Sequence, residues 1–500
     1  MFSERDRGVQ YHPIGSAHVG VRRLSGVTES GGRQRPSLDC CLKWALLLVI
    51  GVAILLTVVT IHGFYPVEDP ITPVSILDKI SLLFGVHEQS AIAVINVELF
   101  SSTVFVYVFH RHLSDGSFHV ASETKTQILP GLFDADTPAA LEQRVQELLK
   151  AVVENVPASC IQREATANPK TPIVLAKISP EILDHLPRAE IDRVSKHITL
   201  TFSNASSVQF DPDLSLGTLS KNDAKVLQWF AINLLDHALK RFRVSTSAVI
   251  LDVGASDIEL TFAVSSRQTL PSEGEYVATT RLSAFGHLIK LVTVRYRGLG
   301  LYDARFFMLS QHSSENGTLF HSECMNPISQ AHWTYKGSFY EVVGKEKPDF
   351  ELVKERNGPF AGKKVNRPVA HYQQCHNLAA RYISSHLPEK DAGAIKDLVR
   401  GRKVFMEGLL LEKAMGRGLT LPYRGGDVRM KLFIDSLQHA CKVPNTDQPF
   451  GCVDLMYLAT IVDKALAFKQ GSVLYSSCDI GGMTGEWPLA AAFHVYENGL

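Results

Sequence analysis

The sequence lacks an excess of charge of either sign, because its 51 Lys and Arg residues are balanced by 51 Asp and Glu residues. It has no basic patch of the kind that binds nucleic acid, so we expect no nucleic-acid partner. No two histidines have the His-x-x-x-His spacing that places zinc ligands on one helix face. Hydrophobic residues make up 45% of the chain and charged residues 20%, which is typical of a globular protein. The 500 residues allow two domains or one large bilobal domain.

Long apolar runs are also scarce, because only one reaches the length of a bilayer span. The segment WALLLVIGVAILLTVVTI, residues 44–61, is uncharged and can cross a membrane with slight help from its flanks. No polar face interrupts it, which disfavours the alternative of a buried core helix. The run begins too late for a signal peptide and lacks a small-residue cleavage site. These features predict a retained signal anchor.

The charges on either side of this run predict its orientation. Seven Lys and Arg residues precede it, whereas the first basic residue after it is Lys79. The positive-inside rule therefore places the N-terminus in the cytosol and the large remainder across the membrane. We expect a single-pass, type II membrane protein.

Composition and periodicity divide the rest of the chain. Residues 1–43 are rich in Gly, Ser and Arg and predict a disordered cytosolic tail, and residues 62–89 form a stem with three prolines. Strand pairs followed by helices then occur twice, which predicts an α/β fold of two lobes with related beginnings. We expect lobe I to comprise residues 90–218 and 486–500, and lobe II residues 219–485.

Cysteine usage agrees with this topology. Cys40 and Cys41 lie at the cytosolic edge of the span, where palmitoylation can occur. Six cysteines follow on the lumenal side, an even number in an oxidising compartment. Among them, Cys478 in SSCDIGG is either a thiol nucleophile or, as we expect, half of a disulfide. Two sequons, at Asn204 and Asn316, are available for glycosylation on the same side.

Two segments of the chain are similar to each other. LDVGASDIELTF, residues 251–262, has the pattern of a strand, a tight turn and a second strand, with glycine and small residues in the turn. Residues 91–110 have the same pattern. Successive N–H groups in such a turn can cradle a phosphate. Each segment is therefore either a phosphate loop or an ordinary hairpin, and the local pattern leaves both open.

A bilobal chain that opens each lobe with such a hairpin resembles the actin-like (RNase H-like) ATPase superfamily. Within it, the order of features over residues 90–498 resembles the apyrase and nucleoside diphosphatase family. Besides the second hairpin, the resemblance is carried by QWFAINLL, VRYRGLGLYDAR, PFGCVDLMYL and GEWPLAAAFHVYEN. It implies two actin-like lobes, a nucleoside di- or triphosphate substrate and a divalent metal, calcium or magnesium. It also implies a location in the Golgi, another secretory membrane or the cell surface.

The resemblance assigns roles to individual positions. Asp252 would lie on the metal side, and Glu259 stands at the position of a glutamine that orients water. Counting back from Trp229 places Ala224 at the family's catalytic glutamate, with Asp223 one residue away as a substitute base after a register shift. The implied phosphate-binding positions are Asn96, Ser101, Gly254, Ala255 and Ser256. The expected disulfides are Cys441–Cys452 and Cys324–Cys375.

The chain departs from the family's chemistry at several of these positions. Asn96 replaces a metal-associated aspartate, and Glu98 places a negative side chain in a turn that would approach a polyanion. Asp184 stands where the family has an arginine. Ala224 lacks the carboxylate that activates the attacking water. Asp257 adds a further carboxylate to the second turn, so the departures together predict lost or strongly reduced hydrolysis.

Three functional hypotheses stay open. The first is a lumenal pseudoenzyme of this family that binds a nucleotide, a lumenal enzyme of the same family or a secretory client. The second is an active Golgi nucleoside diphosphatase in which Asp223 is the base and Asp252 the metal-side acid. The third is an unrelated Golgi glycosyltransferase, because Asp134-Ala-Asp136 and Asp211-Pro-Asp213 have the Asp-x-Asp spacing of a metal site, although so short a motif arises readily by chance.

The predicted topology implies N-linked glycans at Asn204 and Asn316. We expect glycosidase treatment of the protein from animal cells to increase its mobility on a denaturing gel. The single variant Asn204→Gln should have an intermediate mobility, and the double variant Asn204→Gln/Asn316→Gln should migrate like the treated protein. A wild type without a shift, or a shift that persists in the double variant, would contradict the lumenal placement.

Overall fold

The computed structural model describes residues 89–111, 118–160, 171–239, 242–265, 276–312, 317–345, 347–354, 361–422 and 424–498. All of them belong to one compact unit, residues 66–500. The predicted tail and signal anchor, the predicted stem up to residue 88, and Asn316 lie outside the described residues. Within the described ranges, we find no helix that combines the length and the apolar character of a membrane span.

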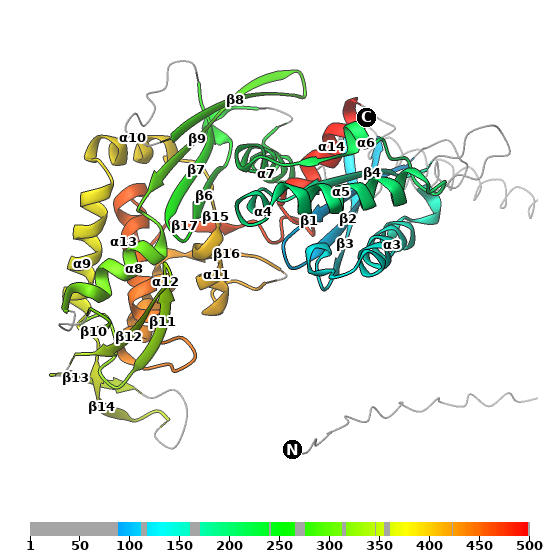
Figure 1. Ribbon diagram of the computed structural model, residues 1–500. Coiled ribbons are helices and arrows are strands. Elements are labelled where there is room, and N and C mark those ends of the chain that lie inside the picture. The colour runs from blue at the N-terminus through cyan, green and yellow to red at the C-terminus, as the bar shows by residue number, and fades with distance from the viewer. Residues whose placement is uncertain are drawn as a thin grey trace, which may run out of the picture. The chain divides into compact units, whose positions relative to one another are not determined.

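The first part of the described chain forms a five-stranded sheet with the order β3-β2-β1-β4-β5 (Figure 1). Its strands are β1 (Gln89–Val97), β2 (Ser102–Arg111), β3 (Phe118–Ile128), β4 (Ile173–Ile178) and β5 (Leu216–Thr218). The accompanying helices are α3 (Pro138–Asn155), α4 (Pro180–His185), α5 (Arg188–Ser203) and α6 (Pro212–Ser215), with the 3-10 turns η1 (Leu132–Asp134) and η2 (Ala158–Cys160). The predicted first hairpin is therefore present as β1 and β2.

Both faces of this sheet are buried, because successive side chains of a strand point to opposite faces. On β1, Ile95 belongs to the core formed with α3 and α5, whereas Val94 belongs to the core formed with α7 (Lys221–Leu235) and α14 (Trp487–Asn498). Helix α3 begins at a cap, where Thr137 accepts a hydrogen bond from the N–H of Ala140 at 3.2 Å.

The second part forms a seven-stranded sheet with the order β16-β17-β15-β6-β7-β9-β8. Its strands are β6 (Val249–Val253), β7 (Asp257–Ala263), β8 (Tyr276–Ala284), β9 (His287–Arg297), β15 (Val404–Glu407), β16 (Asp427–Arg429) and β17 (Val473–Ser476). Its remaining helices are α8 (Leu301–Leu309), α9 (Tyr372–His386), α10 (Glu389–Val399), α11 (Gly408–Gly416), α12 (Met430–Lys442) and α13 (Gly451–Leu466), with η3 (Val244–Thr246) and η4 (Ser310–His312). The second predicted hairpin is β6 and β7.

The two sheets share one connectivity. In the first, β1, β2 and β3 pair antiparallel in sequence order, and β4 and β5 continue from β1 in parallel. In the second, β6, β7 and β9 pair antiparallel, and β15 and β17 continue from β6 in parallel. The expectation of a mixed α/β fold with two related beginnings is confirmed by this repeated order.

Helices α7 and α14 connect the two sheets (Figure 1). They share one apolar core with β1 and β2 on one side and with β6, β9 and β15 on the other. Trp229 of α7 is fully buried and donates its indole N–H to the carbonyl of Ala248 at 2.9 Å, just before β6. Ahead of α14, Thr484 donates both its N–H (2.7 Å) and its hydroxyl (2.6 Å) to the carboxylate of Glu123 on β3.

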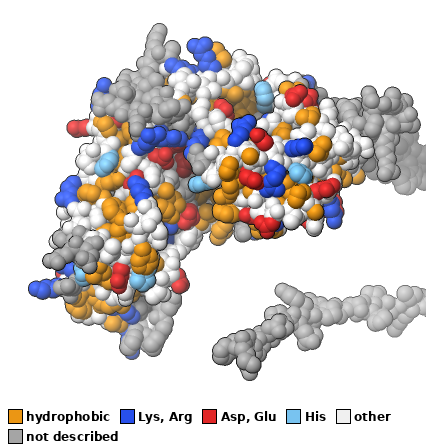
Figure 2. Space-filling model, viewed as in Figure 1, with side chains coloured by type: hydrophobic (Ala, Val, Ile, Leu, Met, Phe, Trp, Pro, Cys, Tyr) orange, Lys and Arg blue, Asp and Glu red, His pale blue; other side chains and the backbone are white. Residues whose placement is uncertain are grey.

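Two small sheets extend from the second part. They contain β10 (Leu319–Ser322), β11 (Gln330–Tyr335) and β12 (Ser338–Gly344) in one sheet, and β13 (Asp349–Lys354) and β14 (Lys364–Val369) in the other. Apolar side chains reach the surface over them, notably Phe339, Phe350 and Leu352. On the face shown in Figure 2, the charged side chains of both signs are interspersed over the described residues.

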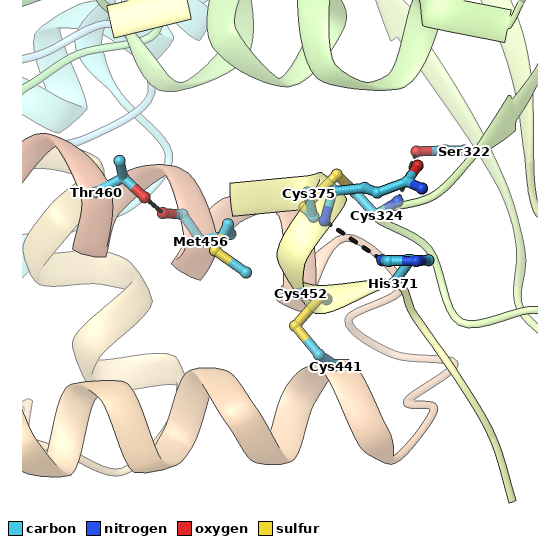
Figure 3. The surroundings of a disulfide bond; sticks show 9 residues. Ser322, Cys324, His371, Cys375, Cys441, Cys452, Met456 and Thr460 are labelled. Atoms are coloured by element: carbon cyan, nitrogen blue, oxygen red, sulfur yellow. Dashed lines mark hydrogen bonds between the residues drawn. A yellow bond between two sulfur atoms is a disulfide. The ribbon is translucent and has the colours of Figure 1, made fainter. Parts of the chain in front are cut away.

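Both predicted disulfides are confirmed (Figure 3). Cys324 follows β10 and bonds to Cys375 in the first turn of α9, and Cys441 at the end of α12 bonds to Cys452 at the start of α13. Cys478, in contrast, forms no disulfide within the described part of the chain. The expectation that Cys478 is half of a disulfide was wrong.

An ion pair is buried between α8 and α13. Arg305 donates two hydrogen bonds to the carboxylate of Asp454, at 2.7 and 2.6 Å, and both side chains are almost fully buried. The guanidinium carbon also lies 4.7 Å from the ring centroid of Tyr302, 5.1 Å from that of Trp333 and 4.6 Å from that of Phe450. These contacts surround the guanidinium with aromatic rings from α8, β11 and the segment before α13, so the pair joins α8 to β11 and α13.

Removing one partner of this pair should destabilise the fold strongly. We expect Arg305→Leu to lower the free energy of unfolding by about 3–5 kcal/mol, because it removes both hydrogen bonds to the buried carboxylate of Asp454 and leaves it only Lys413, at 3.9 Å. Arg188→Leu is the control, because Arg188 and Asp192 form an exposed pair at 3.2 Å, and it should cost less than about 1 kcal/mol. Urea unfolding with the disulfides intact measures both. Equal losses in the two variants would contradict this view of the buried pair.

Candidate functional site

A cleft of about 550 Å³ opens where the first hairpin turn, the start of α7 and the carboxyl end of β6 meet. Four positions that the sequence assigned to the site line it: Asn96, Ala224, Asp252 and Glu259. Five others lie in the flanking turns and do not line it: Asp223, Ser101, Gly254, Ala255 and Ser256. Asp184 belongs to α4, and its side chain lies outside the described ones.

The first hairpin turn binds its own carboxylate. Asn96 donates its amide N–H to Glu98 at 2.8 Å, and the hydroxyl of Ser101 donates to the other oxygen of Glu98 at 2.6 Å. The N–H of Glu98 donates to the carbonyl of Ser101 at 3.0 Å and closes the turn. The two side chains that were predicted to hold phosphate therefore hold Glu98.

Asn96 keeps one polar atom without a partner. Its side chain is 7% exposed, and the structure gives its carbonyl oxygen, Oδ1, no hydrogen-bond donor. A buried amide oxygen without a donor costs free energy.

The second hairpin turn is packed against the start of α8. Gly254 donates its N–H to the carbonyl of Asp257 at 2.8 Å, and a Cβ on Gly254 would lie 2.6 Å from the carboxylate of Asp257. The carbonyls of Gly254 and Ala255 accept hydrogen bonds from the N–H groups of Leu301 (3.0 Å) and Tyr302 (2.8 Å). These carbonyls therefore occupy the N-terminal amides of α8, a place where helices otherwise attract anions.

The start of α7 separates the two candidate bases. Ser220 caps the helix by accepting the N–H of Asp223 at 3.1 Å, and its hydroxyl donates to the Asp223 carboxylate at 2.6 Å. Asp223 is exposed at this cap. Ala224 is the residue that faces the cleft. The carboxylate of Asp223, the candidate substitute base, is thus engaged at the helix cap. The residue that lines the cleft is Ala224, whose side chain is a methyl group.

Three carboxylates stand in a row across the second sheet, and we call Glu407, Asp252 and Glu259 the carboxylate row. Asp252 on β6 is the register partner of Glu407 on β15 and of Glu259 on β7. Neighbouring strands are about 4.8 Å apart. All three side chains line the cleft, so three negative charges lie side by side, an arrangement that destabilises a sheet unless cations compensate it.

Two basic side chains supply that compensation. Lys225 of α7 forms an ion pair with Asp252, and both side chains are about one-fifth exposed, 22% and 19%. Arg295 of β9 is the register partner of Glu259, forms an ion pair with it and lies 3.5 Å from the carboxylate of Asp257. Lys225 therefore compensates the charge of the middle member of the carboxylate row, and Arg295 compensates the charge of Glu259 at its end.

Glu407 is the member of the row with an altered acidity. Its carboxylate accepts a hydrogen bond from the hydroxyl of Ser477. Burial raises the pKa of Glu407 to about 7, although the bond from Ser477 and the nearby charge of Lys225 oppose that rise. The charge of the cleft therefore changes near neutral pH.

The cleft is acidic as a whole. Seven carboxyl groups and three basic side chains line it, which gives a formal charge of −4 when every group is ionised. A polyphosphate carries negative charge of its own, so this surplus opposes its entry in the absence of a cation. The acids are Glu98, Glu181, Asp252, Asp257, Glu259, Glu407 and Glu486, and the bases are Lys221, Lys225 and Arg295.

The carboxylate row does not fit a divalent metal. Among the described residues, no three His, Cys, Asp or Glu side chains are grouped so that they could hold a metal ion. Asp252, the predicted metal-side acid, is already paired with Lys225, and Glu259 with Arg295. Calcium and magnesium need several free oxygen ligands around one point. The donor set offers them at no place in the described cleft.

The Asp-x-Asp tripeptides lie away from this cleft. Asp134 ends η1, and Asp211 caps α6 by accepting the N–H of Asp213 at 2.9 Å. Their spacing is thus explained by turn and cap geometry.

Lys225, Arg295 and Glu407 were not singled out in the sequence. Lys225 follows Ala224 directly, so its place beside the cleft could have been inferred from the start of α7. Arg295 and Glu407 belong to strands whose register with the second hairpin is fixed only by the fold. Arg295 does lie in VRYRGLGLYDAR, one of the segments that carry the family resemblance, so that segment was the available signal for it, whereas the segment around Glu407 was not among them.

Comparison with known proteins supports the sequence resemblance. No family model matches the chain. Ectonucleoside triphosphate diphosphohydrolase 5 of Mus musculus is 23% identical over 403 residues, which cover 79% of this chain and 85% of that protein. Nucleoside-diphosphatase uda-1 of Caenorhabditis elegans is 22% identical over 401 residues, which cover 75% of this chain and 74% of that protein.

A solved structure shares the fold. The nucleoside triphosphate hydrolases of Neospora caninum superpose with a TM-score of 0.52 at 11% identity, over 84% of this chain and 97% of that one. The chain is therefore similar in sequence to proteins of the apyrase and nucleoside diphosphatase family, of which it would be a divergent member.

Proposed function

We propose that the protein is a type II membrane protein of the Golgi or another secretory-pathway membrane whose two actin-like lobes lie in the lumen and whose cleft has lost nucleotide hydrolysis. The lobes correspond to residues 90–218 with 486–500 and residues 219–485. The basic flank of residues 44–61, the two disulfides and the repeated sheet connectivity support this arrangement. The protein would act by binding a partner.

The observation that carries the proposal is the start of α7. The residue at the position of the family's catalytic glutamate is Ala224, which lines the cleft, and its methyl group cannot accept a proton from water. The neighbouring carboxylate of Asp223 is bonded to Ser220 at the helix cap. To act as a base, Asp223 would have to give up its hydrogen bond with Ser220. Helix α7 would also have to rotate about its axis by about 100° to bring position 223 to where position 224 now lies.

The phosphate side of the cleft supports the same conclusion. Glu98 holds the amide of Asn96 and the hydroxyl of Ser101, so neither donor is free for a phosphate. The formal charge of −4 adds repulsion. Nucleotide binding in this cleft would therefore be weak, which favours a lumenal protein partner, an enzyme of the same family or a secretory client, over a free nucleotide.

The second candidate is an active nucleoside diphosphatase that requires calcium or magnesium. The names of the relatives favour it, since they describe diphosphatases and diphosphohydrolases. It requires Asp223 as base and a metal on Asp252. The unrelated glycosyltransferase receives no support from these relatives.

Purified full-length protein should release phosphate from nucleoside di- and triphosphates at least about a thousandfold slower than an active relative, with calcium or magnesium present. A missing general base costs roughly 10²–10⁴ and a lost electrostatic donor about 10²–10³, although the two do not simply add. A phosphate-release assay at saturating nucleotide measures this. Ala224→Glu should recover less than about tenfold, because Glu98 still occupies the first turn.

Asp223→Asn is the matched variant for the same assay. It keeps the size of the side chain at the helix cap and removes its basicity, so it should leave the low rate unchanged. Robust wild-type turnover that disappears in Asp223→Asn would establish the diphosphatase with the shifted base. Robust turnover that is indifferent to Asp223 would also contradict the pseudoenzyme.

The raised pKa of Glu407 predicts a pH dependence of stability. The usual pKa of a glutamate is 4.5 and that of Glu407 in the folded protein is about 7, so between these values the folded protein keeps a proton that the unfolded chain releases. Stability is therefore lost as pH rises through this window, by on the order of 2 kcal/mol. We expect Glu407→Gln to remove this loss and Glu181→Gln, an exposed carboxyl of the same cleft, to retain it. Urea unfolding between about pH 5 and pH 8 measures the difference, and a parallel decline in Glu407→Gln would refute it.

A further inference from the structure

The pairing of Lys225 with Asp252 stands at the centre of the charged cleft. Lys225 reaches from α7 to the middle member of the carboxylate row, with Glu407 on one side of Asp252 and Glu259 on the other. Burial opposes the charge of this ammonium, but Asp252, with Glu407 and Glu259 around it, outweighs burial and raises the pKa of Lys225. The ammonium is therefore positive throughout the physiological pH range.

A lysine side chain can supply the positive charge that a bound cation would otherwise supply to the carboxylate row. An ammonium group brings one positive charge and three donors to a set of carboxylate oxygens. Because it is part of α7, its effective concentration beside Asp252 does not depend on the ions in solution. A divalent cation would need the same carboxylate oxygens of Asp252, so the two cannot occupy the row together.

We propose that the Lys225 ammonium takes the place of the divalent cation in this cleft, so that the protein binds neither calcium nor magnesium on the carboxylate row and does not need them for the order of the cleft. The inference rests on the proposed function in one respect, namely that this cleft corresponds to the nucleotide cleft of the family. Its consequences concern cation binding and not hydrolysis. They follow from Asp252 being already paired with Lys225.

The test compares the thermal unfolding of the full-length protein with and without calcium or magnesium, at constant ionic strength. The wild type should show no shift in Tm. Lys225→Met should unfold at a lower temperature than the wild type without the ions, because the carboxylate row is left uncompensated. Adding calcium or magnesium should then raise the Tm of Lys225→Met by about 2 °C or more.

Two controls isolate the ammonium. Lys221→Met removes another lysine of the same cleft and the same helix, and it should respond to the ions like the wild type. Lys225→Arg keeps a cation and should also stay unresponsive. A Lys225→Met variant that responds no more than Lys221→Met would overturn the proposal.

A direct measurement covers the case in which Lys225→Met does not fold. Equilibrium dialysis of the wild type against radioactive calcium should show no binding that depends on Asp252. Stoichiometric binding at about millimolar calcium that is lost in Asp252→Asn would overturn the proposal.

The same preparations separate this inference from the proposed function. Nucleotide hydrolysis by the wild type that persists in EDTA would refute the proposed loss of hydrolysis. It would not contradict the proposal that the Lys225 ammonium replaces the divalent cation. Calcium bound through Asp252 without any hydrolysis would refute the proposed replacement of the cation by Lys225. It would not contradict the proposed loss of hydrolysis.

Discussion

The alignment of three carboxylates across neighbouring strands is the constraint on which the cleft depends. Sheet register fixes the backbone of Glu407, Asp252 and Glu259 side by side, and no rotation of one side chain can separate them fully. Their mutual repulsion has to be balanced from outside the row. Lys225 provides the balance from α7 and Arg295 from β9, so the position of α7 against the second sheet is an electrostatic requirement as well as a packing one.

Apolar and amide side chains in the core determine the position of α7 against the second sheet. Trp229 donates to the carbonyl of Ala248, Asn233 donates to the carbonyl of Trp229 at 2.8 Å, and Ala248 donates its N–H to Asn233 at 2.7 Å. These bonds attach α7 to Ala248, the residue directly before β6. The segment QWFAINLL, which carries much of the family resemblance, therefore serves the scaffold. A chain can keep that segment for folding while Ala224, one turn earlier, loses its chemistry.

Much of this structure could be predicted from local sequence patterns. The strand, turn and strand pattern predicted both hairpins, and the family resemblance predicted the two disulfides. Counting back five residues from Trp229 placed Ala224 at the cleft, where Gln228, four residues further along the helix and so on the same face, also lies. The register of β15 with β6 could not be predicted, since Glu407 and Asp252 lie about 150 residues apart and no motif links them. The orientation of Asp223 was missed although Ser220-x-x-Asp223 has the spacing of a helix cap, the pattern that fixes the Asp223 carboxylate on Ser220.

The substitutions in the cleft are connected physically, because each one changes what the next can do. A lysine on Asp252 excludes a divalent cation from the same oxygens, and a cleft without that cation repels a polyphosphate through its surplus of carboxylates. With no phosphate to position, a carboxylate at position 224 would have no water to direct and would add a further negative charge beside the row. An alanine there is then the more stable residue, and Glu98 can occupy the first turn without competing with a ligand. Under the proposed function, the Lys225 ammonium, the missing base and the first turn occupied by Glu98 are therefore consistent with one another.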